Sequence, residues 1–351
     1  MLDVLIVGLG ISGIALAQQL EMNHKSFKVI SDQSQQATTV AGGLFNPINF
    51  KRFSLAWSSP NQKDCFVAFY KYLEDQFATQ FVFNTAVLRK FQSIKEQNDW
   101  FVKADRDDFS SHLNTQLFRG NFRGFDAPFG YGETLSTGYV DTKKLQSVYW
   151  DYLSATGKLI VDTFHYDQLR VFDQHIAYNG LVAKKIIFAE GYGLVKNPFF
   201  NYLPLEGSKG ELLYAKLSIP PSRIISSNVF IIPTPHFCKI GATYHLTDKT
   251  ADTTTEGRLE LEERFSHLYN LPYEIVAQVA GVRPTVKDRI PLLGCHPKYT
   301  NTLFVFNGMG TRGTLLAPAL ASLMYQFIFN EIPLIKEVNI IRYSSLFQSG
   351  L

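Results

Sequence analysis

A glycine-rich turn close to the start of the chain has the residue types and the spacing that bind a dinucleotide. Gly8, Gly10 and Gly13 form the pattern Gly-x-Gly-x-x-Gly, and Asp32 follows about twenty residues further on. In this pattern the first glycine permits a tight turn, the second lets a pyrophosphate approach the backbone, and the third lets a helix pack on a sheet. The pyrophosphate would bind at the N-terminus of that helix, and the carboxylate of Asp32 would accept hydrogen bonds from the adenosine ribose.

A second glycine-rich loop lies near the other end of the chain. Gly308, Gly310 and Gly313 separate a strand-like apolar segment, 302–306, from a helix predicted over about 314–330. A second helix N-terminus of this kind suits a flavin ring, because it stabilises the negative charge that develops on the pyrimidine side of a reduced flavin. Simple NAD dehydrogenases have no need of it, so the sequence favours FAD over NAD as the cofactor.

The elements around the first glycine turn are those that the motif requires. Residues 4–7 are typical of a buried strand, residues 11–21 of a helix, and residues 27–31 of a second strand. Such a βαβ unit predicts parallel neighbouring strands. The apolar run at 184–191, which also ends in glycine, predicts a return of the chain to the same sheet.

The middle of the chain has a different pattern. Residues 50–130 are rich in aromatic and charged residues, and they predict a helix over 65–77 followed by several strands. A further helix is predicted from about 142 to 155, with Asp141 or Thr142 as its N-cap. Residues 205–280 alternate between apolar and polar, which predicts antiparallel strands, and a helix is expected over 255–268.

The chain is therefore expected to leave and re-enter one α/β domain more than once. Its length of 351 residues agrees with two closely joined domains. The predicted fold class is α/β, with a Rossmann-type FAD-binding domain and an interleaved antiparallel-sheet substrate domain of α+β type. We assign 1–50, 131–204 and 281–351 to the FAD-binding domain, and 51–130 and 205–280 to the substrate-binding domain.

Charge and composition argue against several other classes of protein. The net charge of +3 is too small to indicate a nucleic-acid-binding surface. No segment reaches the length of a membrane span, and the N-terminus has no charged leader or cleavage site, so a cytoplasmic protein is expected. The cysteines Cys65, Cys238 and Cys295 lie far apart and form no Cys-x-x-Cys pair, which predicts neither disulfides nor a zinc site.

Metal binding is not expected. The histidines His236, His245 and His296 occur singly, without the spacing of metal ligands. The sequence contains no Gly-x-Ser-x-Gly motif, so it does not indicate a hydrolase of the nucleophile-elbow type.

Over nearly its whole length the chain resembles the D-amino-acid oxidase superfamily of FAD-dependent oxidoreductases, which includes glycine and sarcosine oxidases. Within it, the chain is similar to the FAD module of the bifunctional tRNA wobble-uridine modification enzyme. Besides the first glycine motif and Asp32, the segments that carry the resemblance are 38–44, 138–142, 186–193, 203–211, 240–244, 281–294 and 308–314. The resemblance implies non-covalent FAD bound by Gly8, Gly10, Ile11, Ser12, Gly13, Asp32, Thr39, Ala41, Gly42, Gly43, Gly191, Gly308, Gly310, Thr311, Arg312, Gly313 and Thr314.

Two arginines match positions at which this family places substrate-binding arginines. Arg283, in Val-Arg-Pro, corresponds to the residue that pairs with a substrate carboxylate, and Arg312 to one near the flavin and the substrate entrance. A guanidinium suits this role because it binds a carboxylate through two parallel hydrogen bonds. Either arginine could instead pair with a structural acid.

The sequence departs from the family pattern at two places. Glycine oxidases have a substrate-contacting tyrosine on the strand that corresponds to 230–233, where this chain has Phe230, and Tyr244 is the candidate to replace its hydroxyl. Sarcosine oxidases attach the flavin to a cysteine near the position of Arg283 and Pro284. No cysteine lies there, so covalent attachment is not expected.

The resemblance implies oxidation of the C–N bond of an amino acid or of a secondary amine that carries a carboxylate, by hydride transfer to flavin N5, with oxygen or another molecule as the acceptor. This reaction requires positioning more than acid–base catalysis. Three alternatives stay open: removal of a carboxymethyl group from a tRNA wobble nucleoside, dehydrogenation with a quinone or carrier protein as the acceptor, and flavin binding without catalysis. The nearly neutral charge argues against the tRNA substrate.

Overall fold

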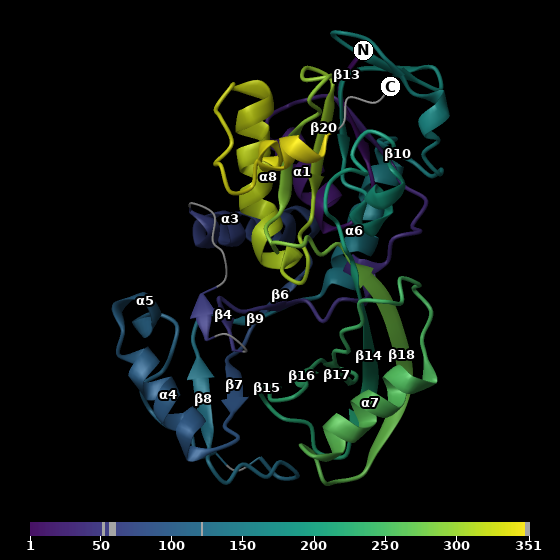
Figure 1. Ribbon diagram of the computed structural model, residues 1–351. Helices are drawn as coiled ribbons and strands as arrows, with labels where there is room; N and C mark the ends of the chain where they lie inside the picture. Colours follow the sequence, from purple (N-terminus) through teal and green to yellow (C-terminus); the bar gives the residue numbers. More distant parts are fainter. Residues whose placement is uncertain (51–52, 56–60, 121, 348–351) are drawn as a thin grey trace.

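The computed structural model describes residues 1–50, 53–55, 61–120 and 122–347. Two large β-sheets dominate it, one in the upper and one in the lower part of Figure 1. The N-terminus lies at the top of the upper part (Figure 1). The chain passes between the two parts several times, as the predicted interleaving requires.

The first sheet has a parallel centre. Its parallel strands are β1 (Leu2–Val7), β2 (Phe27–Ile30), β10 (Leu159–Ile160), β13 (Leu181–Phe188) and β20 (Leu303–Asn307). The antiparallel strands β11 (Arg170–Val171), β12 (Ile176–Tyr178) and β19 (Leu292–Cys295) extend it. The predicted βαβ unit is confirmed, because β1 and β2 pair in parallel, and so is the predicted return, because β13 pairs with β1.

Strand β1 is apolar from Val4 to Val7 because both of its faces are buried there. Val4 and Ile6 belong to the core beneath the helices, whereas Leu5 and Val7 pack into the core on the other face of the sheet. The helices on the first face are α1 (Ile11–Met22), α3 (Gln62–Phe77), α6 (Thr142–Ala155) and α8 (Gly313–Phe329). Asp141 caps α6 as predicted, since its carboxylate accepts a hydrogen bond from the N–H of Lys144 at 3.1 Å.

The second sheet is mainly antiparallel, as predicted for 205–280. Its strands are β7 (Val87–Lys90), β8 (Tyr131–Thr134), β14 (Ser208–Leu217), β15 (Ile224–Ser226), β16 (Phe230–Pro233), β17 (Cys238–Gly241) and β18 (Tyr273–Arg283). Helix α7 (Thr255–Ser266) packs on this sheet through Leu261 and Phe265. Strand β8 pairs with β7 here, although the predicted boundary at residue 131 assigns it to the FAD-binding domain.

The remaining elements are short or lie at the edge of the second sheet. Helix α4 (Ile94–Ala104) was not predicted; it buries Trp100 against Phe91. The other elements are α2 (Ala37–Val40), α5 (Asp107–Ser110), β3 (Leu44–Phe45), β4 (Ile48–Asn49), β5 (Ser54–Leu55), β6 (Val82–Asn84), β9 (Gly138–Val140) and the 3-10 helices η1 (Tyr166–Gln168), η2 (Gly191–Lys196) and η3 (Ile340–Leu346). In the part of the chain that the structure describes, no helix combines the length and the apolar character needed to cross a membrane.

Candidate active site

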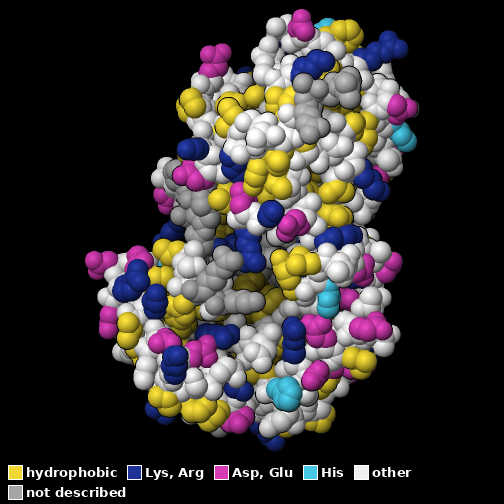
Figure 2. All heavy atoms as spheres, viewed as in Figure 1, with side chains coloured by type: hydrophobic (Ala, Val, Ile, Leu, Met, Phe, Trp, Pro, Cys, Tyr) yellow, Lys and Arg dark blue, Asp and Glu magenta, His cyan; other side chains and the backbone are white. Residues whose placement is uncertain are grey.

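A cavity of about 940 Å³ lies where the two sheets meet. Part of its lining comes from the carboxyl ends of the parallel strands β1, β2 and β13. Residues of β14, β16 and β18 in the second sheet form another part. Ligands bind at such strand ends in open α/β sheets. Figure 2 shows the hollow between the two parts of the molecule, with lysine and arginine side chains along its upper edge and hydrophobic side chains inside it.

The first glycine turn has the backbone geometry that its motif requires. Gly8 has a φ of 100°, and a β-carbon there would lie 2.5 Å from the carbonyl oxygen of Ala189. A β-carbon at Gly13 would lie 2.1 Å from the carbonyl oxygen of Gly8, so α1 can pack on the turn only without a side chain at this position. Gly10 differs, because it lines the cavity and a β-carbon there would meet only the hydroxyl of Thr38, at 3.1 Å.

The N-terminus of α1 presents unpaired N–H groups to the cavity. The N–H of Ile11 donates to Oγ1 of Thr38 at 2.9 Å. The N–H groups of Ser12 and Gly13 have no partner among the described residues. Free N–H groups and the helix dipole both favour an anion, so this position fits the pyrophosphate of a dinucleotide.

Asp32 lies at one end of the cavity. Its carboxylate accepts hydrogen bonds from the N–H of Ser34 at 2.9 Å and from the hydroxyl of Thr163 at 3.0 Å. Burial raises the pKa of Asp32, but these hydrogen bonds outweigh it and leave the pKa below its usual value. Asp32 is therefore ionised at neutral pH and can accept hydrogen bonds from ribose hydroxyls.

Glu190, which the sequence did not single out, lines the same end of the cavity. Its carboxylate accepts hydrogen bonds from the hydroxyl of Tyr166 and, at 2.8 Å, from the amide of Asn197. Burial raises the pKa of Glu190 to about 7, and the negative charge of Asp32 contributes to the rise. Because the pKa in the unfolded chain is near 4.5, the stability that Glu190 contributes is fully present below that pH and is lost as the pH rises to about 7.

We therefore expect Glu190→Gln to flatten the dependence of stability on pH. The variant should be more stable than the wild type at pH 8, by on the order of 3 kcal/mol at most, and the difference should shrink towards pH 5. Urea unfolding at several pH values between 5 and 8 measures this. The control is Glu274→Gln, which replaces an exposed carboxylate and should keep the wild-type dependence. Parallel pH curves for Glu190→Gln and the wild type would contradict the assignment.

The second glycine loop brings another helix N-terminus to the cavity. Gly308 and Gly310 have φ values of 77° and 55°, and the N–H of Gly310 donates to the carbonyl of Pro284 at 3.1 Å. Arg312 is the N-cap of α8 and lines the cavity, and its side chain makes no capping hydrogen bond. Gly313 packs against Ile11 of α1, so the two helix N-termini lie close together.

Arg283, the last residue of β18, lies in the cavity without a carboxylate partner among the described residues. Its guanidinium donates weak hydrogen bonds to the carbonyl of Lys209 at 3.3 Å and to that of Thr243 at 3.4 Å, and it lies 5.8 Å from the ring centre of Tyr244. Burial lowers the pKa of Arg283, yet an arginine stays protonated at any physiological pH. The cavity thus contains a buried charge that nothing in the described chain neutralises.

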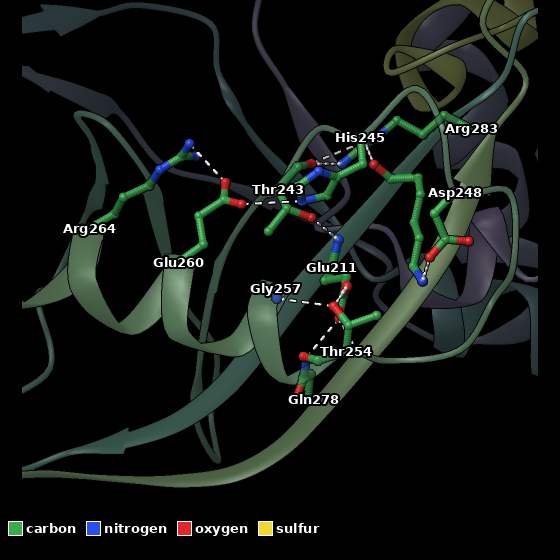
Figure 3. Close-up of polar contacts among 11 residues, drawn as sticks. Glu211, Thr243, His245, Asp248, Thr254, Gly257, Glu260, Arg264, Gln278 and Arg283 are labelled. Carbon is green, nitrogen blue, oxygen red and sulfur yellow. Dashed lines mark hydrogen bonds and ion pairs between the residues drawn. The ribbon is translucent and has the colours of Figure 1, made fainter.

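Polar contacts on the other side of β14 hold the backbone beneath Arg283 (Figure 3). The fully buried carboxylate of Glu211 accepts hydrogen bonds from the hydroxyl and the N–H of Thr254, at 2.7 and 3.0 Å, and from the amide of Gln278 at 2.7 Å. The N–H of Glu211 also donates to the hydroxyl of Thr243 at 2.9 Å, and Lys209 pairs with Asp248. Both carbonyls that Arg283 contacts are therefore fixed in place.

Gly210 provides the space for this guanidinium. A β-carbon at Gly210 would lie 1.9–2.3 Å from the guanidinium atoms of Arg283, so the charged group lies directly against the backbone of β14. We expect Gly210→Ala to displace Arg283 and to lower kcat/KM by about tenfold or more, while FAD stays bound. Gly157→Ala is the control: its φ of 65° makes alanine strained there, but no atom lies within 4 Å of a β-carbon and the residue does not line the cavity, so it should cost stability and leave kcat/KM unchanged. Unchanged kinetics in Gly210→Ala would show that the position of Arg283 is unimportant.

Most of the other predicted site residues also line the cavity. These are Ala41, Gly42, Gly43, Phe230, Tyr244, Gly191, Thr311 and Thr314. Three predicted residues do not line it, namely Gly13, Thr39 and Gly308. Gly13 and Gly308 pack against backbone and side chains. The hydroxyl of Thr39 donates to the carbonyl of Gln36, and the neighbouring Thr38 lines the cavity instead. None of Cys65, Cys238 and Cys295 lines the cavity, which supports the prediction of non-covalent FAD.

A cavity at the carboxyl ends of parallel strands, reached by the N-termini of two helices, is the site of a Rossmann-type dinucleotide-binding domain. The chain belongs to the family of FAD dependent oxidoreductases (DAO), which it matches over residues 3–326. It is thus an FAD-dependent oxidoreductase. The unpaired N–H groups of α1, the ionised Asp32 and the volume of the cavity all fit this cofactor.

Comparison with known proteins agrees with this assignment. The fold is similar to glycine oxidase from Geobacillus kaustophilus, with a TM-score of 0.79 and 20% identity over 97% of both chains. It is also similar to iminodiacetate oxidase from Chelativorans sp. BNC1, with a TM-score of 0.75 and 17% identity over 96% of this chain and 99% of the other. The bifunctional protein ThiO/ThiG of Trichormus variabilis is 23% identical over 94% of this chain, which spans about half (53%) of that relative.

The described residues give no sign of a metal centre. Nowhere among them do three or more His, Cys, Asp or Glu side chains gather closely enough to hold an ion. His245 instead contacts the carboxylate of Glu260 at 3.2 Å, on the outer side of the second sheet.

Proposed function

We propose that this enzyme oxidises the C–N bond of an amino acid, or of a secondary amine that bears a carboxylate, and that Arg283 binds the carboxylate. The guanidinium of Arg283 carries this proposal, because it lies in the cavity, donates only weak hydrogen bonds to two carbonyls and has no carboxylate partner among the described residues. A buried charge without a partner costs stability, so its presence favours a ligand of opposite charge. The glycine oxidase and iminodiacetate oxidase named above act on substrates of this class.

The residues around Arg283 would orient the substrate. The guanidinium lies against β14, so its two outer nitrogens can donate parallel hydrogen bonds to one carboxylate. The ring of Tyr244 lies over the guanidinium, and the ring of Phe230 packs against Gly42 in the cavity wall. Bound FAD supplies the acceptor of a hydride from the carbon next to the substrate nitrogen.

The second glycine loop would assist through charge. The N-terminus of α8, next to Arg312, directs its dipole into the cavity, where negative charge develops during flavin reduction. Phe230 and Leu212 add apolar surface that limits the access of water. These residues position and desolvate the substrate, and the proposal assigns no proton transfer to a side chain.

Anaerobic bleaching of the flavin absorption tests this proposal. The panel contains glycine, N-methyl and N-carboxymethyl glycine and D-amino acids, each with the amine of the same shape that lacks the carboxylate. We expect bleaching by at least one carboxylate-bearing amine and none by its decarboxylated counterpart. If the decarboxylated amines reduce the flavin equally fast, Arg283 has no role in substrate binding and the proposal is wrong.

A further inference from the structure

A third arginine lines the cavity, at the far end of the loop that begins after Arg283. Arg289 lies between β18 and β19 and has a φ of 64°, a backbone conformation that favours glycine. It is exposed, so it lies at the mouth of the cavity rather than inside it. The backbone conformation at this position favours glycine, yet the residue there is an arginine.

Arg289 and Arg312 line the same cavity, and neither guanidinium has a hydrogen-bond or ion-pair partner among the described residues. The loops that carry them are joined by the hydrogen bond from Gly310 to Pro284. Burial lowers the pKa of Arg312, and the positive charge of Arg289 lowers it further. The acid next to Arg289 in the sequence, Asp288, is already bound to Arg342 and Tyr343.

Neither the pyrophosphate of FAD nor the carboxylate proposed for Arg283 is placed to neutralise this pair of charges. The pyrophosphate of FAD fits the N-terminus of α1, and on the proposed function the substrate carboxylate goes to Arg283. Two like charges that repel each other across a cavity are stabilised by an anion between them. A monocarboxylic amino acid has no second acidic group to supply it.

We propose that Arg289 and Arg312 form a second anion-binding position at the mouth of the cavity, and that the preferred substrates carry a second acidic group, a carboxylate or a phosphate. This inference rests on the proposed function, since it assumes that Arg283 binds the first carboxylate. Arg289 is then a residue that determines specificity, because it contacts the part of the substrate remote from the reacting carbon.

Binding of unreactive acids to the FAD-loaded enzyme tests the inference without turnover. Dissociation constants for propionate, succinate and 3-phosphonopropionate are measured by the perturbation of the flavin spectrum. We expect the wild type to bind at least one of the two diacids about tenfold to a hundredfold more tightly than propionate. The tighter of the two identifies the second group as a carboxylate or a phosphate.

The variant Arg289→Gly should remove this preference and leave the affinity for propionate unchanged. Glycine suits the φ of 64°, so the variant should fold at least as stably as the wild type. The control Lys287→Gln removes an exposed charge on the same loop that does not line the cavity, and it should keep the preference. The inference is overturned if the wild type binds all three acids equally. It is also overturned if the preference for a diacid persists in Arg289→Gly, or if this variant loses FAD. If propionate does not bind to the FAD-loaded wild type at all, the carboxylate site at Arg283 is refuted, and the proposed function with it.

Discussion

Gly10→Val should abolish the binding of FAD and leave the protein folded. Gly10 has a φ of −80°, which valine can adopt, and a β-carbon there would meet only the hydroxyl of Thr38, which can move by a few tenths of an ångström. The methyl groups of valine would instead extend into the cavity beside the N-terminus of α1, where the pyrophosphate fits. We expect a colourless preparation that is not reconstituted by added FAD, with a circular dichroism spectrum like that of the wild-type apoprotein.

Gly13→Ala provides the contrast. Its β-carbon would lie 2.1 Å from the carbonyl oxygen of Gly8, so this smaller substitution should destabilise the apoprotein itself. If Gly10→Val retains a yellow colour and releases FAD on denaturation, the pyrophosphate does not pass Gly10 and the assignment of this turn is wrong. If Gly10→Val unfolds as readily as Gly13→Ala, the residue is structural.

The elements that the sequence predicted well are those whose signal is local. The strand, turn and helix around Gly8 to Gly13 are encoded by glycine spacing and by an apolar run, and the cap at Asp141 follows from the residue type alone. Helix α4 also had a local signal that was not used. Ser93 accepts a hydrogen bond from the N–H of Glu96, which is the Ser-x-x-Glu pattern of a capping box.

The site residues that the sequence missed depend on contacts between distant segments. Thr38, and not Thr39, lies at the cavity because its hydroxyl accepts a hydrogen bond from the N–H of Ile11. Gly210 matters because the register of β14 and β18 places it beneath Arg283. The shifted pKa of Glu190 arises mainly from its burial, and Arg289 lines the cavity from a left-handed backbone conformation. Neither sheet register nor burial of a single charged residue can be read from one sequence.

Arg283→Met should remove most of the activity without destabilising the protein. Losing a charge-assisted, two-bond contact with a carboxylate in a closed cavity should cost a few kcal/mol, on the order of a hundredfold or more in kcat/KM. Arg283→Lys should fail almost as badly, because an ammonium group cannot form the paired hydrogen bonds of a guanidinium. Steady-state kinetics with the best substrate of the panel measure both effects, and FAD content is determined for each variant.

The thermal stability of these variants separates a substrate-binding role from a structural one. The guanidinium of Arg283 makes only weak hydrogen bonds, of 3.3–3.4 Å to two carbonyls, besides its contact with the ring of Tyr244. Arg283→Met therefore removes an uncompensated buried charge and should leave the apoprotein as stable as before, or more stable. A structural arginine would give the opposite result, with a large loss of stability. Arg312→Met is the matched comparison at the flavin side of the cavity, and it should reduce activity less. If Arg283→Met retains FAD and still binds carboxylates and reduces the flavin as the wild type does, the main support for an amino-acid substrate is lost. Among the described residues of β18, Arg283 is the cation that lines the cavity.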